Sequence, residues 1–263
     1  MTDLPLPGGQ QFGASPSFID LLAESRESAP EVTGRLPEGM AAPHGTTVLS
    51  LKFDGGVIIA GDRRATEGYS IADERIDKVF AADEYSAIAI AGAAGQATEI
   101  VKLFQTELEH YEKVQGDRLS LEGKANRLAQ MIRQNFPMAL QGLVVVPLFG
   151  GYDERRGEGR LFRYDATGGR WEEENFHATG SGGRAAKGTL KKRWKPGLSR
   201  ADAVRAAVES LRDASEEDAA TGGPDPVRGI YPSMVVITSE GCSHVPQDEV
   251  RAAYEELIGG GSA

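Results

Sequence analysis

The chain has 263 residues, of which 40% are hydrophobic, and this is enough apolar surface for one sizeable core. Its formal net charge of −10 gives no attraction to nucleic acid or to an anionic membrane, so neither is expected as a partner. Cys242 is the single cysteine, which excludes an intramolecular disulfide and favours a reducing cytoplasm as the location.

Residues 1–45 differ in composition from the rest of the chain. They are rich in Pro, Gly, Ser and Glu, and their only concentrated apolar patch runs over 18–22. Such a segment cannot bury enough surface to offset its chain entropy, so we expect it to be largely disordered, with one short helix at most. The chain has neither a signal-peptide pattern nor the roughly eighteen consecutive apolar residues that span a bilayer. We therefore expect neither secretion nor membrane insertion.

A folded domain is predicted to begin at Thr46 with a β-hairpin. TTVLSLKF, the dipeptide Asp54-Gly55 and then GVIIAGD indicate two strands joined by a two-residue turn. Further extended segments are predicted over 76–80, 86–92, 142–153, 159–165, 234–239 and 242–245. Helical spacing of apolar residues predicts helices over 94–111, 121–132 and 184–194, one that begins at Ser199 as its cap, and one over 248–258.

The order of these elements indicates an α+β fold. Runs of strands alternate with pairs of helices, which favours two packed sheets between helical layers, a four-layer αββα sandwich. Periodicity alone leaves other α+β arrangements open.

Five sequence segments carry the chemistry. At the start of the folded region stands GTTVLSLKFDGGVIIAGDRRAT, and by itself its Gly-Thr-Thr is a weak signal, because Thr favours strands and Gly favours the loop before one. The others are the lysine of RIDKVF, the strand end AIAGAAG, the turn ATGSGG and the segment EDAATGGPD. Together, in this order, they resemble the proteasome β subunits of actinobacteria, which are N-terminal nucleophile hydrolases. The resemblance covers nearly all of 46–260.

The resemblance implies a threonine peptidase with an αββα fold, a prosegment over 1–45 and a catalytic domain over 46–263. Cleavage between Gly45 and Thr46 would expose Thr46 as the N-terminal nucleophile. A hydroxyl needs a base to take its proton, and an α-amino group, with a pKa of roughly 7.7–8.0, becomes one only after the preceding peptide bond is cut. Gly45 has no side chain, so it can approach the attack geometry. Thr47 is the rival nucleophile, on the opposite face of the strand, and only the family pattern assigns the role to Thr46.

The same pattern assigns an acid–base pair and an oxyanion site. Lys78 matches the active-site lysine, whose charge would lower the pKa of the nearby amine and hydroxyl. Asp62 matches the carboxylate that pairs with this lysine. Gly92 matches the residue whose backbone N–H holds the oxyanion. Without the resemblance, Lys78 and Asp62 would be an ordinary surface pair and Gly92 a strand terminator.

Three residues match those that brace the N-terminal amine: Ser181, Asp218 and Thr221. Relatives commonly have serine at the position of Thr221, which retains the hydroxyl. The alternative interpretation places Ser181 in a helix-entry turn and Asp218 in a solvated acidic loop.

The pocket for the residue before the cut matches mostly apolar positions, namely Ala65, Ile76, Ile90, Ala94 and Thr98. They predict cleavage after large hydrophobic residues, although all five could simply belong to the core. Thr66 would exchange backbone hydrogen bonds with an extended substrate. Its neighbour Glu67 could instead favour basic side chains.

No cofactor or metal is expected. The four histidines, His44, His110, His177 and His244, share no metal-binding spacing. GSGGRAAKGT lacks the spacing of a phosphate-binding loop, so ATP hydrolysis is not expected. Cys242 on its strand is interpreted as a small buried hydrophobe.

The resemblance also implies partners. The β chains would form seven-membered rings stacked between rings of a different α subunit, and a partner ATPase would deliver unfolded chains marked by a small ubiquitin-like protein. Two alternatives remain open. One is a non-catalytic β subunit that serves as a wall of the ring, although such subunits generally lose the threonine, lysine or aspartate. The other is the two-ring bacterial peptidase of the same fold, which is shorter and usually starts almost directly at its threonine.

Overall fold

The computed structural model describes residues 45–67 and 70–259. The predictions for the prosegment, disorder with one short helix at most, fall on residues outside the described part of the chain, apart from Gly45. Among the described helices, none is long and apolar enough to cross a membrane.

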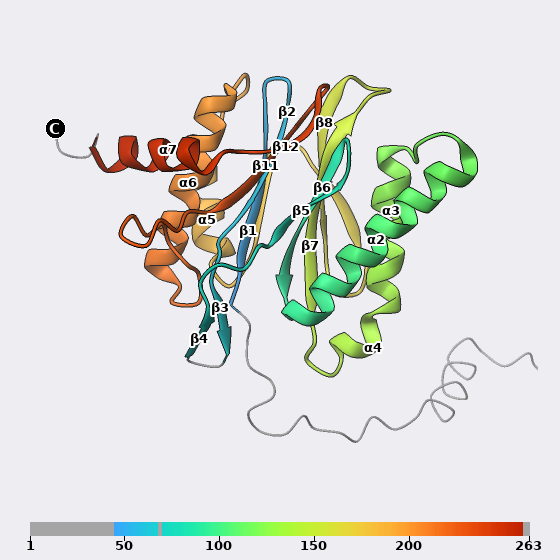
Figure 1. The fold of residues 1–263 in the computed structure, drawn as a ribbon, viewed down its shortest axis with the longest axis horizontal. Helices are drawn as coiled ribbons and strands as arrows, with labels where there is room; N and C mark the ends of the chain where they lie inside the picture. Colours follow the sequence, from blue (N-terminus) through green and yellow to red (C-terminus); the bar gives the residue numbers. More distant parts are fainter. Residues whose placement is uncertain (1–44, 68–69, 260–263) are drawn as a thin grey trace, which may run out of the picture. The chain divides into compact units, whose positions relative to one another are not determined.

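Two five-stranded antiparallel sheets form the centre of the domain (Figure 1). The first sheet has the order β10-β1-β2-β11-β12 and contains β1 (Thr47–Phe53), β2 (Gly56–Gly61), β10 (Phe176–Gly180), β11 (Ser233–Thr238) and β12 (Gly241–His244). The second has the order β5-β6-β7-β8-β9 and contains β5 (Val79–Asp83), β6 (Ser86–Gly92), β7 (Val145–Asp153), β8 (Glu158–Tyr164) and β9 (Arg170–Glu173). A separate hairpin pairs β3 (Ala65–Glu67) with β4 (Ser70–Asp73).

Helices cover the outer face of each sheet (Figure 1). The first sheet packs against α5 (Gly183–Arg193), α6 (Arg200–Glu217) and α7 (Gln247–Gly259). The second packs against α2 (Ala94–Gln115) and α3 (Leu121–Gln134), and α3 is followed by the short α4 (Phe136–Ala139). The predicted four-layer αββα sandwich is therefore confirmed.

Strand alternation divides the core into three layers. Along β1, Val48 faces the second sheet, where it packs with Leu148 and Leu161. Leu49 and Leu51 point the other way, into the layer formed with α5 and α6. Because β1 is buried on both faces, its first residues are held firmly at one end of the sandwich.

Most predicted elements are present, with shifted ends. The hairpin of β1 and β2 forms as expected, and Ser199 Oγ caps α6 by accepting the Asp202 N–H at 3.1 Å. The first helix runs four residues beyond the predicted 111 and ends before Gly116, whose φ of 71° is left-handed. The predicted strand over 76–80 begins only at Val79.

Two strands of the large sheets, β9 and β10, and the two strands of the small hairpin, β3 and β4, were wholly or partly missed by the sequence prediction. They are short, and their side chains are mostly polar or exposed, so they lack an apolar alternation. Pairing determines their structure: β10 pairs with the longer β1, β9 pairs with the longer β8, and β3 and β4 pair with each other.

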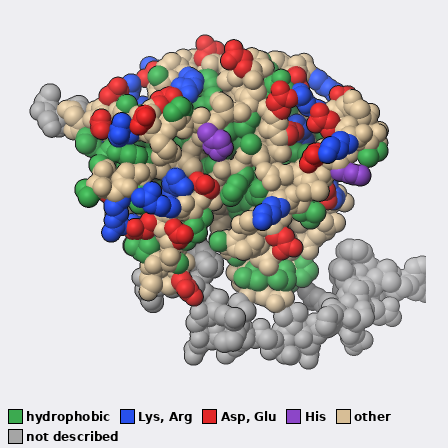
Figure 2. All heavy atoms as spheres, in the orientation of Figure 1, with side chains coloured by type: hydrophobic (Ala, Val, Ile, Leu, Met, Phe, Trp, Pro, Cys, Tyr) green, Lys and Arg blue, Asp and Glu red, His purple; other side chains and the backbone are tan. Residues whose placement is uncertain are grey.

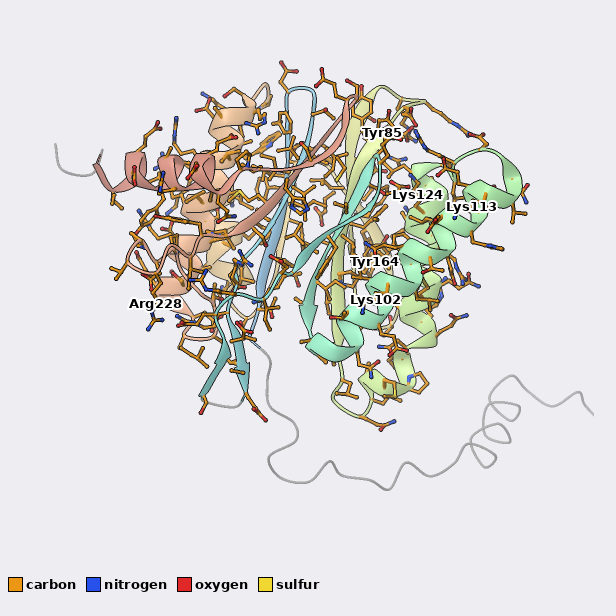
Figure 3. The ribbon with its side chains drawn as sticks, viewed as in Figure 1. Tyr85, Lys102, Lys113, Lys124, Tyr164 and Arg228 are labelled. Carbon is orange, nitrogen blue, oxygen red and sulfur yellow. The ribbon has the colours of Figure 1, made fainter. Side chains whose placement is uncertain are left out.

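Charged side chains also join the layers. Acidic and basic groups are interspersed over the face shown in Figure 2. Lys124 of α3 pairs with Asp83 at the end of β5, and Tyr164 of β8 donates to the Ala125 carbonyl of α3 at 2.9 Å (Figure 3). Both contacts hold α3 on the second sheet.

Another such charge is Arg160 on β8, whose side chain is only 3% exposed. Its guanidinium contacts three carboxylates, those of Asp153 at 3.0 Å, Glu122 at 2.6 Å and Glu172 at 2.6 Å. The hydrogen bond from Arg160 lowers the pKa of Glu172, in opposition to the burial of this carboxyl. A lowered carboxyl pKa means that this contribution is present at neutral pH and is lost as the pH falls through the folded-state pKa.

We expect Arg160→Met to lower the free energy of unfolding by about 2–4 kcal/mol, because it leaves three carboxylates without their shared cation. The matched control Arg156→Met removes an arginine that is 57% exposed on the neighbouring turn and should change stability by less than about 0.5 kcal/mol. Urea unfolding at neutral pH measures both. Equal losses in the two variants would contradict a structural role for the Arg160 cluster.

Candidate active site

A buried ion pair lies at the end of the sandwich where β1 begins. Asp62 follows β2 of the first sheet and Lys78 precedes β5 of the second, and their side chains are 0% and 6% exposed. Lys78 Nζ donates to Asp62 Oδ1 and to the Arg64 carbonyl, each at 2.6 Å. Burial lowers the pKa of Lys78, while the charge of Asp62 opposes this shift. The interpretation as an ordinary surface pair is therefore wrong.

Backbone donors complete the surroundings of Asp62. Its Oδ1 also accepts the Thr47 N–H at 2.8 Å, and its Oδ2 accepts the N–H groups of Arg64 at 3.0 Å and Gly222 at 2.8 Å. The carboxylate thus joins the first residues of β1 to the loop that follows α6. It also holds Lys78 beside them.

Thr46 lies beside this pair and is 5% exposed. Its N–H donates to Ser181 Oγ at 3.3 Å, and its carbonyl accepts the Ser181 N–H at 3.0 Å. The preceding Gly45 donates its N–H to Thr66 Oγ1 at 3.1 Å. These contacts hold the Gly45–Thr46 peptide bond on both sides.

Gly45 occupies a position that has no room for a side chain. A Cβ placed on it would lie 1.8 Å from the Cβ of Ala220, far inside van der Waals contact. The loop that follows α6 therefore packs directly against the backbone at Gly45. Glycine is needed here because of a close approach.

Ser181 and Thr221 share one carboxylate oxygen. Both donate to Asp218 Oδ2, Thr221 at 2.6 Å, while Asp218 Oδ1 accepts the Ala220 N–H at 3.2 Å. Burial alone would raise the pKa of Asp218, but these hydrogen bonds bring it below its ordinary value. Asp218 is thus a hydrogen-bond acceptor that is linked to Thr46 through Ser181. It is not merely a solvated loop residue, which was the alternative interpretation.

Thr47 points away from Thr46. Its side chain is fully buried, and its Oγ1 lies 2.6 Å from Thr221 Oγ1 and accepts the Gly182 N–H at 3.0 Å. This agrees with the expected alternation of the two threonines along β1.

Thr46 and Lys78 line one pocket together with Gly92, which ends β6. All five positions predicted to form the pocket line it: Ala65, Ile76, Ile90, Ala94 and Thr98. Thr66 and Glu67 are not among the lining residues, and Thr66 instead contacts Gly45. Gly92 has a φ of 120°, and a Cβ on it would lie 2.0 Å from the Val144 carbonyl oxygen. The turn into α2 therefore requires glycine at this position.

Three further lining residues were missed by the sequence analysis: Asp77, Phe80 and Ala97. Strand and helix periodicity could have found two of them. Phe80 lies two residues after Lys78 on an extended segment, and Ala97 lies one helical turn after Ala94. The sequence analysis also missed Arg64, whose guanidinium donates to the carbonyls of Ala219 at 2.9 Å and Thr221 at 3.4 Å.

The His, Cys, Asp and Glu side chains that the structure describes are not arranged for metal binding. Within residues 45–67 and 70–259, no group of three or more His, Cys, Asp or Glu could hold a metal ion. Burial raises the pKa of Cys242 to about 12, so this thiol is protonated at neutral pH. Burial likewise lowers the pKa of His177 to about 4, so this imidazole is neutral there. His44 lies outside the described residues.

Comparison with known proteins agrees with this geometry. The family model described as "Proteasome subunit" matches residues 42–227. The chain is also 54% identical over 242 residues to a protein of Acidimicrobium ferrooxidans named "Proteasome subunit beta", an alignment that covers 92% of this chain and 89% of the relative. The resemblance inferred from the sequence is confirmed, and the chain belongs to the proteasome subunit family.

Proposed function

We propose that the chain is a catalytic β subunit of a proteasome core, a threonine endopeptidase activated by its own cleavage of the Gly45–Thr46 bond. The observation that carries the proposal is the position of Thr46. Its backbone nitrogen contacts Ser181, and it lines the same apolar pocket as the buried Lys78. A nucleophile, a buried cation and a side-chain pocket are the parts that such a peptidase needs.

Activation begins with attack of Thr46 Oγ on the Gly45 carbonyl carbon. The peptide C–N bond breaks, the acyl group passes to Oγ as an ester, and the nitrogen becomes a free amine. Water then hydrolyses the ester, which releases residues 1–45 with a new carboxylate on Gly45. The lack of a side chain on Gly45 permits the close approach of Ala220 and of the attacking oxygen.

In turnover, the freed amine takes the proton of Thr46 Oγ as this oxygen attacks the substrate carbonyl. The ammonium group of Lys78, held by Asp62, lowers the pKa of the hydroxyl and the amine nearby. The backbone N–H of Gly92 stabilises the oxyanion, a contribution of about 2.7–4 kcal/mol for one such donor. The amine returns its proton to the leaving nitrogen, and water hydrolyses the remaining acyl ester.

The pocket favours a hydrophobic side chain before the cut. Its lining includes Ile76, Phe80 and Ile90. Among the described residues of the lining, the one carboxylate is that of Asp77, which is paired with Arg63 at 3.0 Å. Thr66 lies beside Gly45 and would bond an extended substrate as an added strand.

Catalysis is favoured over a purely structural role because Thr46, Asp62 and Lys78 are all present and adjoin one another. The similarity to a protein named as a proteasome β subunit favours a proteasome core over the two-ring bacterial peptidase. We extend the proposal to its expected partners, namely α subunits, seven-membered rings, an ATPase and substrates marked by a small ubiquitin-like protein, in the cytoplasm.

Intact mass tests the proposal after co-expression with the α subunit. We expect the parent chain to lose the mass of residues 1–45, because Thr46 Oγ cleaves the bond before it. A Thr46→Ala variant should keep its full mass in a particle of the same size. If the particle assembles but the parent chain keeps its full mass, the proposal is refuted. A non-catalytic β subunit that serves as a wall of the ring would then be the favoured alternative.

The contact of Gly45 with Ala220 predicts a steric limit on activation. We expect Gly45→Ala to slow cleavage by about tenfold or more, since the new methyl would overlap the Cβ of Ala220. A second substitution, Ala220→Gly, should restore part of the rate. Gly188→Ala, where a Cβ meets no atom within 4 Å, is the matched control and should be cleaved like the parent. The time course of the cleaved mass measures all four chains, and parent-like cleavage of Gly45→Ala would refute the limit.

A further inference from the structure

The hydroxyl of Thr47 belongs to a chain of hydrogen bonds that ends at Thr46. The Gly182 N–H donates to Thr47 Oγ1 at 3.0 Å, and Thr47 Oγ1 in turn lies 2.6 Å from Thr221 Oγ1. Thr221 contacts Asp218 Oδ2 at 2.6 Å, Ser181 contacts the same oxygen, and Thr46 N contacts Ser181 Oγ at 3.3 Å. Residues from β1, the start of α5 and the end of α6 are joined in one network.

The donors and acceptors of this network can be assigned in only one way. The pKa of Asp218 lies below its ordinary value, so at neutral pH its carboxylate only accepts hydrogen bonds. Each hydroxyl has one proton, and Ser181 and Thr221 both direct theirs to Asp218. The bond between Thr47 and Thr221 therefore has Thr47 as its donor. Ser181 retains only lone pairs for the Thr46 nitrogen.

This arrangement is the one that the proposed base requires. A neutral amine accepts a proton through its single lone pair, and a hydroxyl that donated to this lone pair would block it. Because Ser181 accepts from Thr46 N, the lone pair of the freed amine stays available for the Thr46 hydroxyl. The orientation of Ser181 is thus part of the chemistry.

We propose that Thr47 is a positioning residue for the Thr46 mechanism, an inference that rests on the proposed function. The Thr47 hydroxyl accepts from the Gly182 N–H and donates to Thr221. Thr221 and Ser181 therefore both donate to Asp218, and the lone pair of the Thr46 amine stays available. Removal of the Thr47 hydroxyl leaves Thr221 Oγ1 without the hydrogen bond that it accepts from Thr47. It also leaves the Gly182 N–H, next to Ser181, without its acceptor.

The experiment uses the particle assembled with the α subunit and compares the parent with Thr47→Val, Thr47→Ser and Ser50→Ala. Thr47→Val keeps the side-chain shape, and Thr47→Ser keeps the hydroxyl. Ser50 provides the matched control, since its buried hydroxyl on the same strand has no hydrogen-bond partner among the described residues. Size exclusion and melting temperature establish assembly, and a peptide with an apolar residue before the cut gives kcat and KM.

We expect Thr47→Val to lower kcat by about 10- to 100-fold and to leave KM within about twofold, because Thr47 is not among the residues that line the pocket. Thr47→Ser should recover most of the loss, and Ser50→Ala should resemble the parent. Parent-like kcat in Thr47→Val, or equal loss in Thr47→Ser, would overturn the inference. If Thr47→Val does not assemble, Thr221→Val removes the same bond from its other end, together with the bond to Asp218, and parent-like kcat there would overturn the inference equally.

Failure of the proposed function itself would be visible before any variant is compared. A parent particle that assembles but shows no peptidase activity would refute the Thr46 mechanism. An active parent whose Thr47→Val variant is equally active would refute only the role of Thr47.

Discussion

The candidate site depends on one buried carboxylate. Asp62 is fully buried and accepts hydrogen bonds from Lys78, Thr47, Arg64 and Gly222. An ionised group in such a place costs several kcal/mol unless its oxygen atoms are satisfied. The four donors come from both sheets and from the loop after α6, so correct stacking of the layers is a condition for forming the site. Fold and site are therefore coupled through this residue.

The pair of Asp62 and Lys78 explains how a cation can be kept beside Thr46. Burial lowers the pKa of Lys78 and the charge of Asp62 opposes this, so each group makes the burial of the other tolerable. A second carboxylate, Asp218, is linked to Thr46 through Ser181. The nucleophile that we propose thus lines a pocket with a buried lysine and contacts a network of hydroxyls.

Local pattern predicted the long elements well. The hairpin of β1 and β2 and the cap at Ser199 follow from residues adjacent in sequence. Short polar strands such as β9 and β10 were missed because pairing with a longer strand determines their structure, and for β10 this partner is β1, far away in the chain. A sequence-based prediction reads periodicity, and these strands have none.

In the site too, some features could be predicted from local sequence and others depend on contacts between distant residues. Motif resemblance brought Thr46, Asp62 and Lys78 to attention, and the structure places them together. The contact of Gly45 with Ala220 and the bond of Thr47 with Thr221 join residues more than 170 positions apart. Neither has a local sequence signal, because each arises only when the loop after α6 packs against the start of β1. Such contacts required the folded structure.

The central claim, that Thr46 Oγ forms the acyl ester, is tested most directly by trapping this ester. Assembled particles would be mixed with a peptide ester, quenched in acid within one turnover and digested for mass spectrometry. We expect to find the acyl group on the peptide that begins at Thr46, attached to its first residue. An acyl group on Thr47 or on another side chain of an active particle would contradict it.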